Sequence, residues 1–217
     1  MDRFLHEVWV ARWAILEGLL TTIEVSAISI VAGSALGLLI GVALTYGPKW
    51  LRWPCLLYVD FIRGTPVLVL VLAAFYILAV IGIHFSAIQA GVFALSLFCA
   101  AHVGEVVRGA LQAIPQGQIE AARSIGLKFP HILGLVLLPQ ALRQVVPVWI
   151  NVGAELVKAS TLLSIIGVGE LLLKTQQIVG RNFMTLEFYL LAGALYFAVN
   201  FCIERVGKRA ERRFALR

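Results

Sequence analysis

The chain has 217 residues, of which 60% are hydrophobic and 14% are charged, and its formal net charge is +6. A soluble domain carries about 45–50% apolar and about 25% charged residues, so one soluble core cannot bury this excess of apolar side chains. The composition therefore excludes a disordered chain, a disulfide-rich scaffold and an ordinary soluble enzyme, and it predicts an all-α, polytopic membrane protein.

Apolar segments of span length recur along the chain. A bilayer span needs about 20 mostly apolar residues, so we predict a single transmembrane domain, residues 1–217, with five transmembrane helices. These spans lie at about 19–44, 56–83, 88–111, 148–168 and 188–203. No room remains for a catalytic or nucleotide-binding soluble domain, so a partner or an ion gradient must supply any energy that the protein uses.

The first span carries a row of small residues. Gly33, Gly37 and Gly41 recur at every fourth position, which places them on one face of a helix. Such rows let two helices approach closely in lipid, so we interpret this one as a helix-packing face.

The second span contains a predicted interruption near its start. Asp60 and Arg63 are three residues apart, so their side chains can face each other on a helix. Gly64 and Pro66 follow directly, and a proline inside a helix breaks or kinks it. We therefore predict that the helix is broken or bent here.

Ionisable side chains inside the spans form the clearest functional pattern. Such groups are costly in a membrane and usually face a partner or a polar cavity. Three pairs of opposite charge occur at a spacing of three residues: Asp60 with Arg63, Glu105 with Arg108, and Glu155 with Lys158. Each pair either neutralises itself within the bundle or lines a pathway for a zwitterion, whose carboxylate needs a cation and whose ammonium needs an anion. The spacing alone favours neither interpretation.

A polar loop, residues 112–139, connects the third and fourth spans and is predicted to hold two short helices. Pro115 can open the first helix and Gly126 can end it, since glycine adopts the positive φ of a sharp turn. The segment from Glu120 to Gly126 places small alanines on one side of a short helix, which suits insertion into a groove on a partner. An amphipathic helix lying on the membrane surface is the alternative.

Charge predicts the orientation of the chain. The basic C-terminal tail holds Arg205, Lys208, Arg209, Arg212, Arg213 and Arg217 against Glu204 and Glu211. Because Lys and Arg collect in cytoplasmic loops, we expect a cytoplasmic C-terminus and, with five spans, an N-terminus outside. The loops after the first and third spans are basic, and the other two are uncharged or nearly neutral. This bias explains the net positive charge without a nucleic-acid partner.

The sequence offers no metal-binding or nucleophile motif. The histidines, His6, His84, His102 and His131, are scattered, and the cysteines, Cys55, Cys99 and Cys202, lie far apart within or beside apolar stretches. We therefore predict no metal site, and we interpret the cysteines as small core residues.

The loop between the third and fourth spans resembles the coupling-loop signature of ABC importer permeases. That signature stands here as Glu120-Ala121-Ala122, Gly126, Val136 and Leu138-Pro139. Further segments resemble the branch that takes up polar amino acids, namely 63–66, 105–109, 114–120, 138–143 and 158–168. The resemblance covers residues 18–204, nearly the whole chain.

The resemblance implies a transmembrane permease subunit of an ATP-driven importer for a polar amino acid or amino-acid-like solute, in a bacterial cytoplasmic (inner) membrane. Two permease chains, identical or homologous, form the pathway, and an extracytoplasmic solute-binding protein delivers the solute. Two ATPase subunits bind ATP and Mg²⁺ and receive the coupling loop, so this chain needs no cofactor and is not an enzyme. The expected coupling residues are Glu120, Ala121, Ala122 and Gly126.

The resemblance also identifies a substrate path and several departures from the family pattern. We expect the path to include Arg63, Gly64, Thr65, Glu105, Arg108, Glu155, Lys158, Ser160 and Thr161. Ala159 replaces a usual Asp, His102 a usual Tyr and Leu70 a usual Gln. If the usual Asp meets the substrate ammonium, either Glu155 replaces it or this chain is the weaker-binding half of a heterodimer.

Two other classes of function remain open at this stage. An ion-coupled secondary transporter or channel subunit could use the intramembrane charge pairs directly, but it has no reason to carry a coupling loop. A purely structural membrane anchor explains the apolar composition but leaves the charge pairs unexplained. The identity of the solute and the choice between homodimer and heterodimer also stay open.

Overall fold

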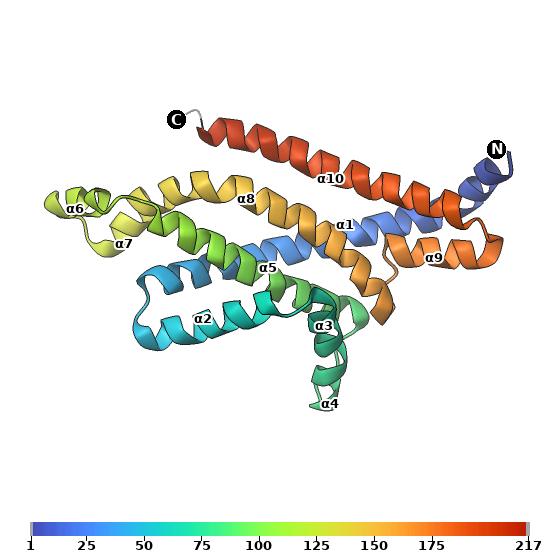
Figure 1. The fold of residues 1–217 in the computed structure, drawn as a ribbon, viewed down its shortest axis with the longest axis horizontal. Coiled ribbons are helices and arrows are strands. Elements are labelled where there is room, and N and C mark those ends of the chain that lie inside the picture. Colours follow the sequence, from blue (N-terminus) through green and yellow to red (C-terminus); the bar gives the residue numbers. More distant parts are fainter. Residues whose placement is uncertain (1, 216–217) are drawn as a thin grey trace.

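The protein is an elongated bundle of helices, and no strand occurs in residues 2–215, which the computed structural model describes (Figure 1). Side chains are described for residues 3–209. The tail charges Glu211, Arg212 and Arg213 therefore lie outside the described side chains, and Arg217 lies outside the described residues. The α-helices are α1 (Asp2–Tyr46), α2 (Lys49–Gly64), α3 (Val67–Leu72), α4 (Leu78–Val80), α5 (Ala87–Gln112), α6 (Gln116–Ser124), α7 (Phe129–Ile132), α8 (Leu138–Ala159), α9 (Leu171–Asn182) and α10 (Thr185–Ala215).

Three tighter or wider helical turns join these elements. The π-helical turns η1 (Ala73–Ile77) and η2 (Leu133–Leu137) lie between α3 and α4 and between α7 and α8, and the 3₁₀ turn η3 (Ser160–Ile166) follows α8. Within the described residues, four helices are long and apolar enough to cross a membrane: Arg3–Tyr46, Ala87–Gln112, Phe129–Ile166 and Thr185–Arg209. The bent pair Lys49–Gly64 and Val67–Val80 makes five if it counts as one span. The predicted all-α, polytopic architecture is confirmed.

The predicted interruption of the second span is confirmed at Pro66. Helix α2 ends at Gly64, and Thr65 is extended with φ −103° and ψ 132°. A residue before proline is disfavoured from the helical region, which explains why the helix stops here. The next helical segment, Val67–Val80, leaves at 111° to α2. In Figure 1 α3 and α4 turn away from the long axis of the bundle.

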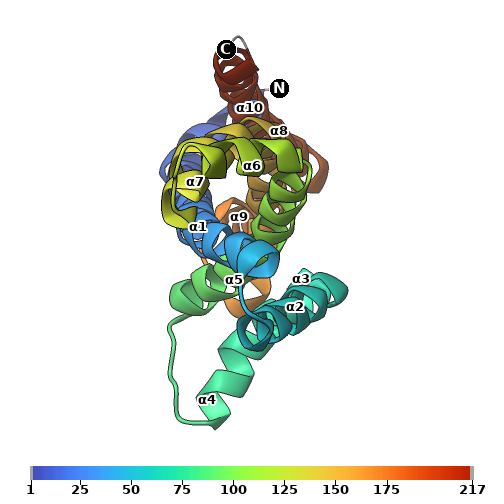
Figure 2. The same cartoon turned by 90° about the vertical axis from the view of Figure 1, so that its left-hand side faces the viewer.

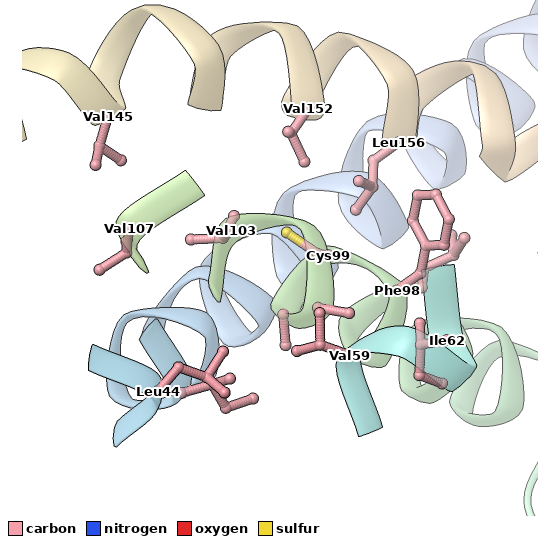
Figure 3. Packing of buried hydrophobic residues seen from close by; sticks show 14 of the residues in the cluster. Leu44, Val59, Ile62, Phe98, Cys99, Val103, Val107, Val145, Val152 and Leu156 are labelled. Atoms are coloured by element: carbon pink, nitrogen blue, oxygen red, sulfur yellow. The ribbon is translucent and has the colours of Figure 1, made fainter. Parts of the chain in front are cut away.

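The glycine row packs α1 directly against α5, as predicted. A Cβ added at Gly33 would lie 2.4 Å from the Cβ of Cys99, and one at Gly41 would lie 2.5 Å from the Cβ of Val107. Only glycine permits this approach between the helices. The main core continues from this contact to α2 and α8, as Figure 3 shows for Val59 and Val152 among others.

The cysteines divide between the core and the surface. Cys99 is buried in the main core, as predicted, and Cys55 is half-buried. Cys202 is exposed on α10, so its interpretation as a core residue is wrong. An apolar neighbourhood in sequence does not indicate whether a helix face meets protein or lipid, because both environments are apolar.

The fourth long helical segment starts earlier than the span we predicted. Helical structure runs from Phe129 through Ile166, not from residue 148. The last part of the predicted loop, residues 129–139, is therefore helical and continues into α8. Pro139 lies in the first turn of α8 and Pro147 lies inside it without ending it. A proline in the first turn removes no hydrogen bond that the helix needs, which accounts for Pro139, whereas Pro147 removes one inside α8 without ending the helix.

The helix ends lie in two groups, one at each end of the long axis of the bundle. The α1–α2 turn, α6 and the C-terminal end of α10 lie at one end of the bundle, and the N-terminus and α9 lie at the other (Figure 1). Viewed from the α6 end, α10 lies at one side of the bundle and α2 to α4 lie at the opposite side (Figure 2). The basic segments expected in the cytoplasm therefore share one end.

Glu170 links three helices at the opposite end, and the sequence analysis did not identify it. The fully buried carboxylate accepts hydrogen bonds from the backbone N–H groups of Leu172 and Leu173, at 2.9 and 2.8 Å, and from the Tyr196 hydroxyl at 2.5 Å. The Thr22 hydroxyl oxygen accepts the N–H of Leu171 at 3.2 Å. Glu170 thus caps α9 and joins it to α10. Thr22 of α1 accepts a further N–H group at the same end of α9.

We expect Glu170→Ala to lower the free energy of unfolding by about 1–3 kcal/mol, because it leaves buried donors without an acceptor. Glu170→Gln keeps one oxygen acceptor and should cost less. Thermal unfolding of the purified chain in mild detergent measures both changes. Glu187→Ala, an exposed carboxylate on α10, is the control, and equal losses in the two alanine variants would contradict this role for Glu170.

Glu170 should also make the stability of the protein depend on pH. Burial raises the pKa of Glu170 above its ordinary value of 4.5, and the hydrogen bonds from Tyr196, Leu172 and Leu173 oppose the rise. The folded state therefore binds the proton more tightly than the unfolded state. The resulting contribution to stability is complete below pH 4.5 and decreases as the pH rises through the pKa of the folded state.

Candidate functional site

Helix α6 is a short, sharply bounded helix at one end of the bundle (Figures 1 and 2). Pro115 precedes its first residue, as predicted. At its other end, Gly126 has φ +83°, and the N–H groups of Gly126 and Leu127 donate to the carbonyls of Arg123 and Ala122 at 2.9 and 3.1 Å. This is a glycine-terminated Schellman turn, so the predicted positive φ of Gly126 is confirmed.

The two adjacent alanines of α6 face different surroundings. Ala122 is buried in the main core cluster with Ile132 and Leu137, whereas Ala121 is exposed. The expectation that the alanines share one open side is therefore wrong, because consecutive residues on a helix are separated by about 100°. Ala122 attaches α6 to the bundle, and Ala121 faces outward beside the exposed Glu120.

Ile125 is the residue at this end that the sequence analysis missed. Its side chain is 77% exposed, directly before the turn at Gly126. Exposed apolar side chains beside a polar rim are typical anchors of protein–protein contacts. No signal in the sequence separates Ile125 from Leu127, the apolar residue on the other side of Gly126, which packs partly buried against the main core.

A charged cluster joins α2 to α5. Arg108 donates from both Nε and a terminal nitrogen to the Glu105 carboxylate, with 2.9 Å between Nε and Oε2. Arg63, in the last turn of α2, places its guanidinium 3.9 Å from the same carboxylate. The side chains of Arg63, Glu105 and Arg108 are 44%, 26% and 29% exposed. The predicted pair of Glu105 with Arg108 is therefore formed, and Arg63 adds a cation from a second helix.

The other two predicted charge pairs do not form among the described residues. Arg63 lies near Glu105 rather than Asp60, because α2 packs against α5 and the break at Pro66 ends α2 beside it. Glu155 and Lys158 are both exposed, and no ion pair joins them in this part of the chain. A spacing of three residues permits two side chains to meet on a helix. It does not show whether either side chain instead contacts a residue of another helix.

The remaining residues of the expected substrate path have other contacts or none. The hydroxyl of buried Ser160 donates to the Val157 carbonyl at 2.8 Å, and that of Thr161 donates to the Lys158 carbonyl at 2.7 Å. Thr65 donates to the Phe61 carbonyl at 2.7 Å, and Gly64 is exposed. Turn η3, which holds Ser160 and Thr161, packs against α3 and α5, so it lies beside the helix that follows the break.

The cluster offers arginine donors to a ligand group. Arg63 and Arg108 share the Glu105 carboxylate, and the negative charge of Asp60 also acts on Arg108, so these side chains together carry no net charge. Their partial exposure leaves donors accessible. Arginine binds carboxylates through paired N–H groups, so the cluster is suited to hold a carboxylate of a small solute.

Comparisons with known proteins identify the family of the chain. Residues 33–216 match the family described as binding-protein-dependent transport system inner membrane component. The chain is 37% identical to the probable amino-acid ABC transporter permease protein YckA of Bacillus subtilis, over 85% of this chain and 82% of that protein. It is 30% identical to the glutamine transport system permease protein GlnP of Escherichia coli K12, over 96% of each chain.

Solved structures show the same fold. The chain superimposes on a crystal structure of an amino acid ABC transporter with histidines with a TM-score of 0.88 and 30% identity, covering 97% of this chain and 98% of that one. It also resembles an inward-facing MetNI methionine ABC transporter, with a TM-score of 0.82, 25% identity, and coverage of 93% and 96%. Because the family match and these relatives span most of the chain, this protein belongs to the binding-protein-dependent transport system inner membrane components and is a permease subunit of an ABC transporter.

Proposed function

We propose that this chain forms the transmembrane pathway of an ATP-driven importer for a polar amino acid or amino-acid-like solute. In this proposal, it couples to a separate ATPase through the segment from Glu120 to Gly126. The observation that supports this most directly is α6, a short helix at one end of the bundle that exposes Glu120, Ala121 and Ile125 and ends in a glycine turn. An ion-coupled carrier has no need for such a helix.

The charged cluster supports the class of solute. Every α-amino acid presents a carboxylate, and Arg63 and Arg108 provide partly exposed guanidinium groups that can donate to it. The relatives are named for glutamine, arginine and L-cystine transport, which all share this group. Glu155, exposed on α8, is the proposed anion for the ammonium group, since Ala159 replaces the acidic residue usual in the family.

The assembly follows from the same proposal. Two ATPase subunits bind ATP and Mg²⁺ and contact the α6 end, and a second permease chain, identical or homologous, completes the pathway. An extracytoplasmic solute-binding protein delivers the solute at the end that holds α9. The N-terminus then lies outside and the C-terminus in the cytoplasm of a bacterial inner membrane, which agrees with the grouping of basic segments at the α6 end.

We expect Gly126→Val to uncouple the ATPase while leaving the bundle folded. A Cβ at Gly126 meets nothing within 4 Å, so the free-energy cost of valine at this position arises from its backbone φ of +83°. An L-residue in the left-handed region costs about 1–2 kcal/mol, so the correct turn becomes about fivefold to thirtyfold less populated. Affinity purification of the tagged chain, followed by measurement of co-purified ATPase and solute-stimulated hydrolysis, should show a loss of this size.

Gly180→Val is the matched control for this experiment. Gly180 also has no neighbour within 4 Å of a Cβ, but it lies within α9 at an ordinary helical φ. It should retain both the ATPase and its stimulation. Normal solute-stimulated hydrolysis in Gly126→Val, or the absence of any ATPase from the purified wild-type complex, would reject the coupling proposal.

A further inference from the structure

An apolar groove of about 720 Å³ lies between α1, α8 and α10, and its lining includes no residue of the charged cluster or of α6. Its walls include Ile23 and Ile30 of α1, Trp149 and Gly153 of α8, and Val206 of α10. All three helices belong to segments long and apolar enough to cross a membrane. The groove therefore lies at the depth of the hydrocarbon core of a membrane.

Packing explains why the three helices leave this space open. Near one end, Gly207 of α10 meets α8 so closely that an added Cβ would lie 2.5 Å from Ile150. At the other end, Phe188 of α10 packs in a small cluster with Ala11 of α1. Between these contacts the facing residues include small ones such as Ala27, Gly153 and Ala198, which do not fill the gap.

Two arginines lie just beyond the lining of the groove, at the α6 end of the bundle. On α8, Arg143 lies one helical turn before the lining residue Val146, and on α10, Arg209 lies one turn after Val206. Both arginines are exposed. Because α8 and α10 run in opposite directions (Figure 1), these two positions lie at the same end. Among the described side chains, no ion pair uses Arg143 or Arg209, whereas the neighbouring Lys208 lies 3.8 Å from Glu204.

We propose that this groove is a specific site for an anionic phospholipid such as phosphatidylglycerol. One acyl chain lies along the groove between Ile30, Trp149 and Val206, and the phosphate is held by Arg143 and Arg209. Basic residues at the membrane surface attract anionic lipids by about 1 kcal/mol per Lys or Arg. A groove that is apolar along its length, with two arginines beyond one end, complements such a lipid.

Trp149 provides a reporter inside the groove. Its side chain is 37% exposed and its ring N–H donates to the Ser34 hydroxyl at 2.6 Å. A variant that keeps Trp149 as its single tryptophan is made by replacing Trp9, Trp13, Trp50 and Trp53 with phenylalanine. The full-length variant is reconstituted into phosphatidylcholine vesicles that contain increasing fractions of phosphatidylglycerol or phosphatidylcholine with brominated acyl chains, which quench tryptophan fluorescence.

Brominated phosphatidylglycerol should quench Trp149 at a mole fraction about tenfold or more below that needed for brominated phosphatidylcholine. Each arginine contributes about 1 kcal/mol, which corresponds to about a fivefold preference. Replacing Arg143 and Arg209 with glutamine should abolish the preference. Arg52→Gln, an exposed arginine on α2 outside the groove, should preserve it.

Two outcomes would overturn the proposal. Equal quenching by the two brominated lipids in the variant with both arginines intact would show ordinary, unselective lipid contact. Absence of quenching by either lipid would show that protein, such as a second copy of the chain, occupies the groove. Neither outcome bears on ATPase coupling, so this test is independent of the proposed transport function.

Discussion

Replacing Gly37 with leucine should prevent formation of the folded bundle. A Cβ at this position would lie 2.7 Å from the Cβ of Val103 and 2.9 Å from the carbonyl oxygen of Ala100. The oxygen belongs to the backbone of α5 and cannot rotate away, so α1 and α5 must separate. Overpacking in a well-packed core costs about 1–3 kcal/mol, and separating two helices along their length costs more than a local rearrangement.

Thermal unfolding and size-exclusion chromatography in mild detergent measure this effect. We expect Gly37→Leu to yield aggregated or early-melting protein. Gly193→Leu is the matched control, because Gly193 lies in α10, is exposed and has no atom within 4 Å of an added Cβ. Similar melting of the two variants would mean that α1 and α5 do not pack through the glycine row.

Glu105→Gln should reduce solute uptake about tenfold without reducing the amount of protein in the membrane. The substitution retains the shape of the side chain but removes the charge that Arg63 and Arg108 share. Arg63 and Arg108 then lose the charged acceptor that holds their guanidinium groups in place, so they no longer present ordered N–H groups to the carboxylate of the solute. Hydrogen bonds to charged groups are worth about 1.5–3 kcal/mol, although partial exposure of all three side chains reduces this.

Uptake of labelled amino acids by cells that express the complete transporter measures the effect, and immunoblotting of membranes measures insertion. Glu187→Gln, an exposed carboxylate in the first turn of α10, should leave both unchanged. Parallel loss of uptake and of inserted protein in Glu105→Gln would assign Glu105 a purely structural role. Unchanged uptake would remove it from the substrate path.

Features that depend on composition or on a short stretch of sequence could be predicted without a structure. The apolar composition and the length of the apolar segments determined a helical membrane protein, since a span of about 20 apolar residues fits a helix, which satisfies its backbone groups within the segment. The Gly33–Gly37–Gly41 row indicated a close helix contact, Pro66 a break and Gly126 a left-handed turn. In each case, a single residue type imposes its own steric or conformational constraint, so the neighbouring fold is not needed to infer the outcome.

The identities of partners across helices depended on the tertiary structure. Arg63 contacts Glu105 rather than Asp60, Glu170 is buried between helices, and Ala122 faces inward while Ile125 faces outward. The spacing of charges along one helix shows which contacts the helix permits. The packing between helices decides which partner lies nearest to each charged side chain. The sequence by itself therefore determined the class of protein, the break at Pro66 and the left-handed turn at Gly126. The composition of the charged cluster depends on how α2 packs on α5, and the groove depends on how α1, α8 and α10 are placed. Only the tertiary structure decided both, because they involve residues far apart in the chain.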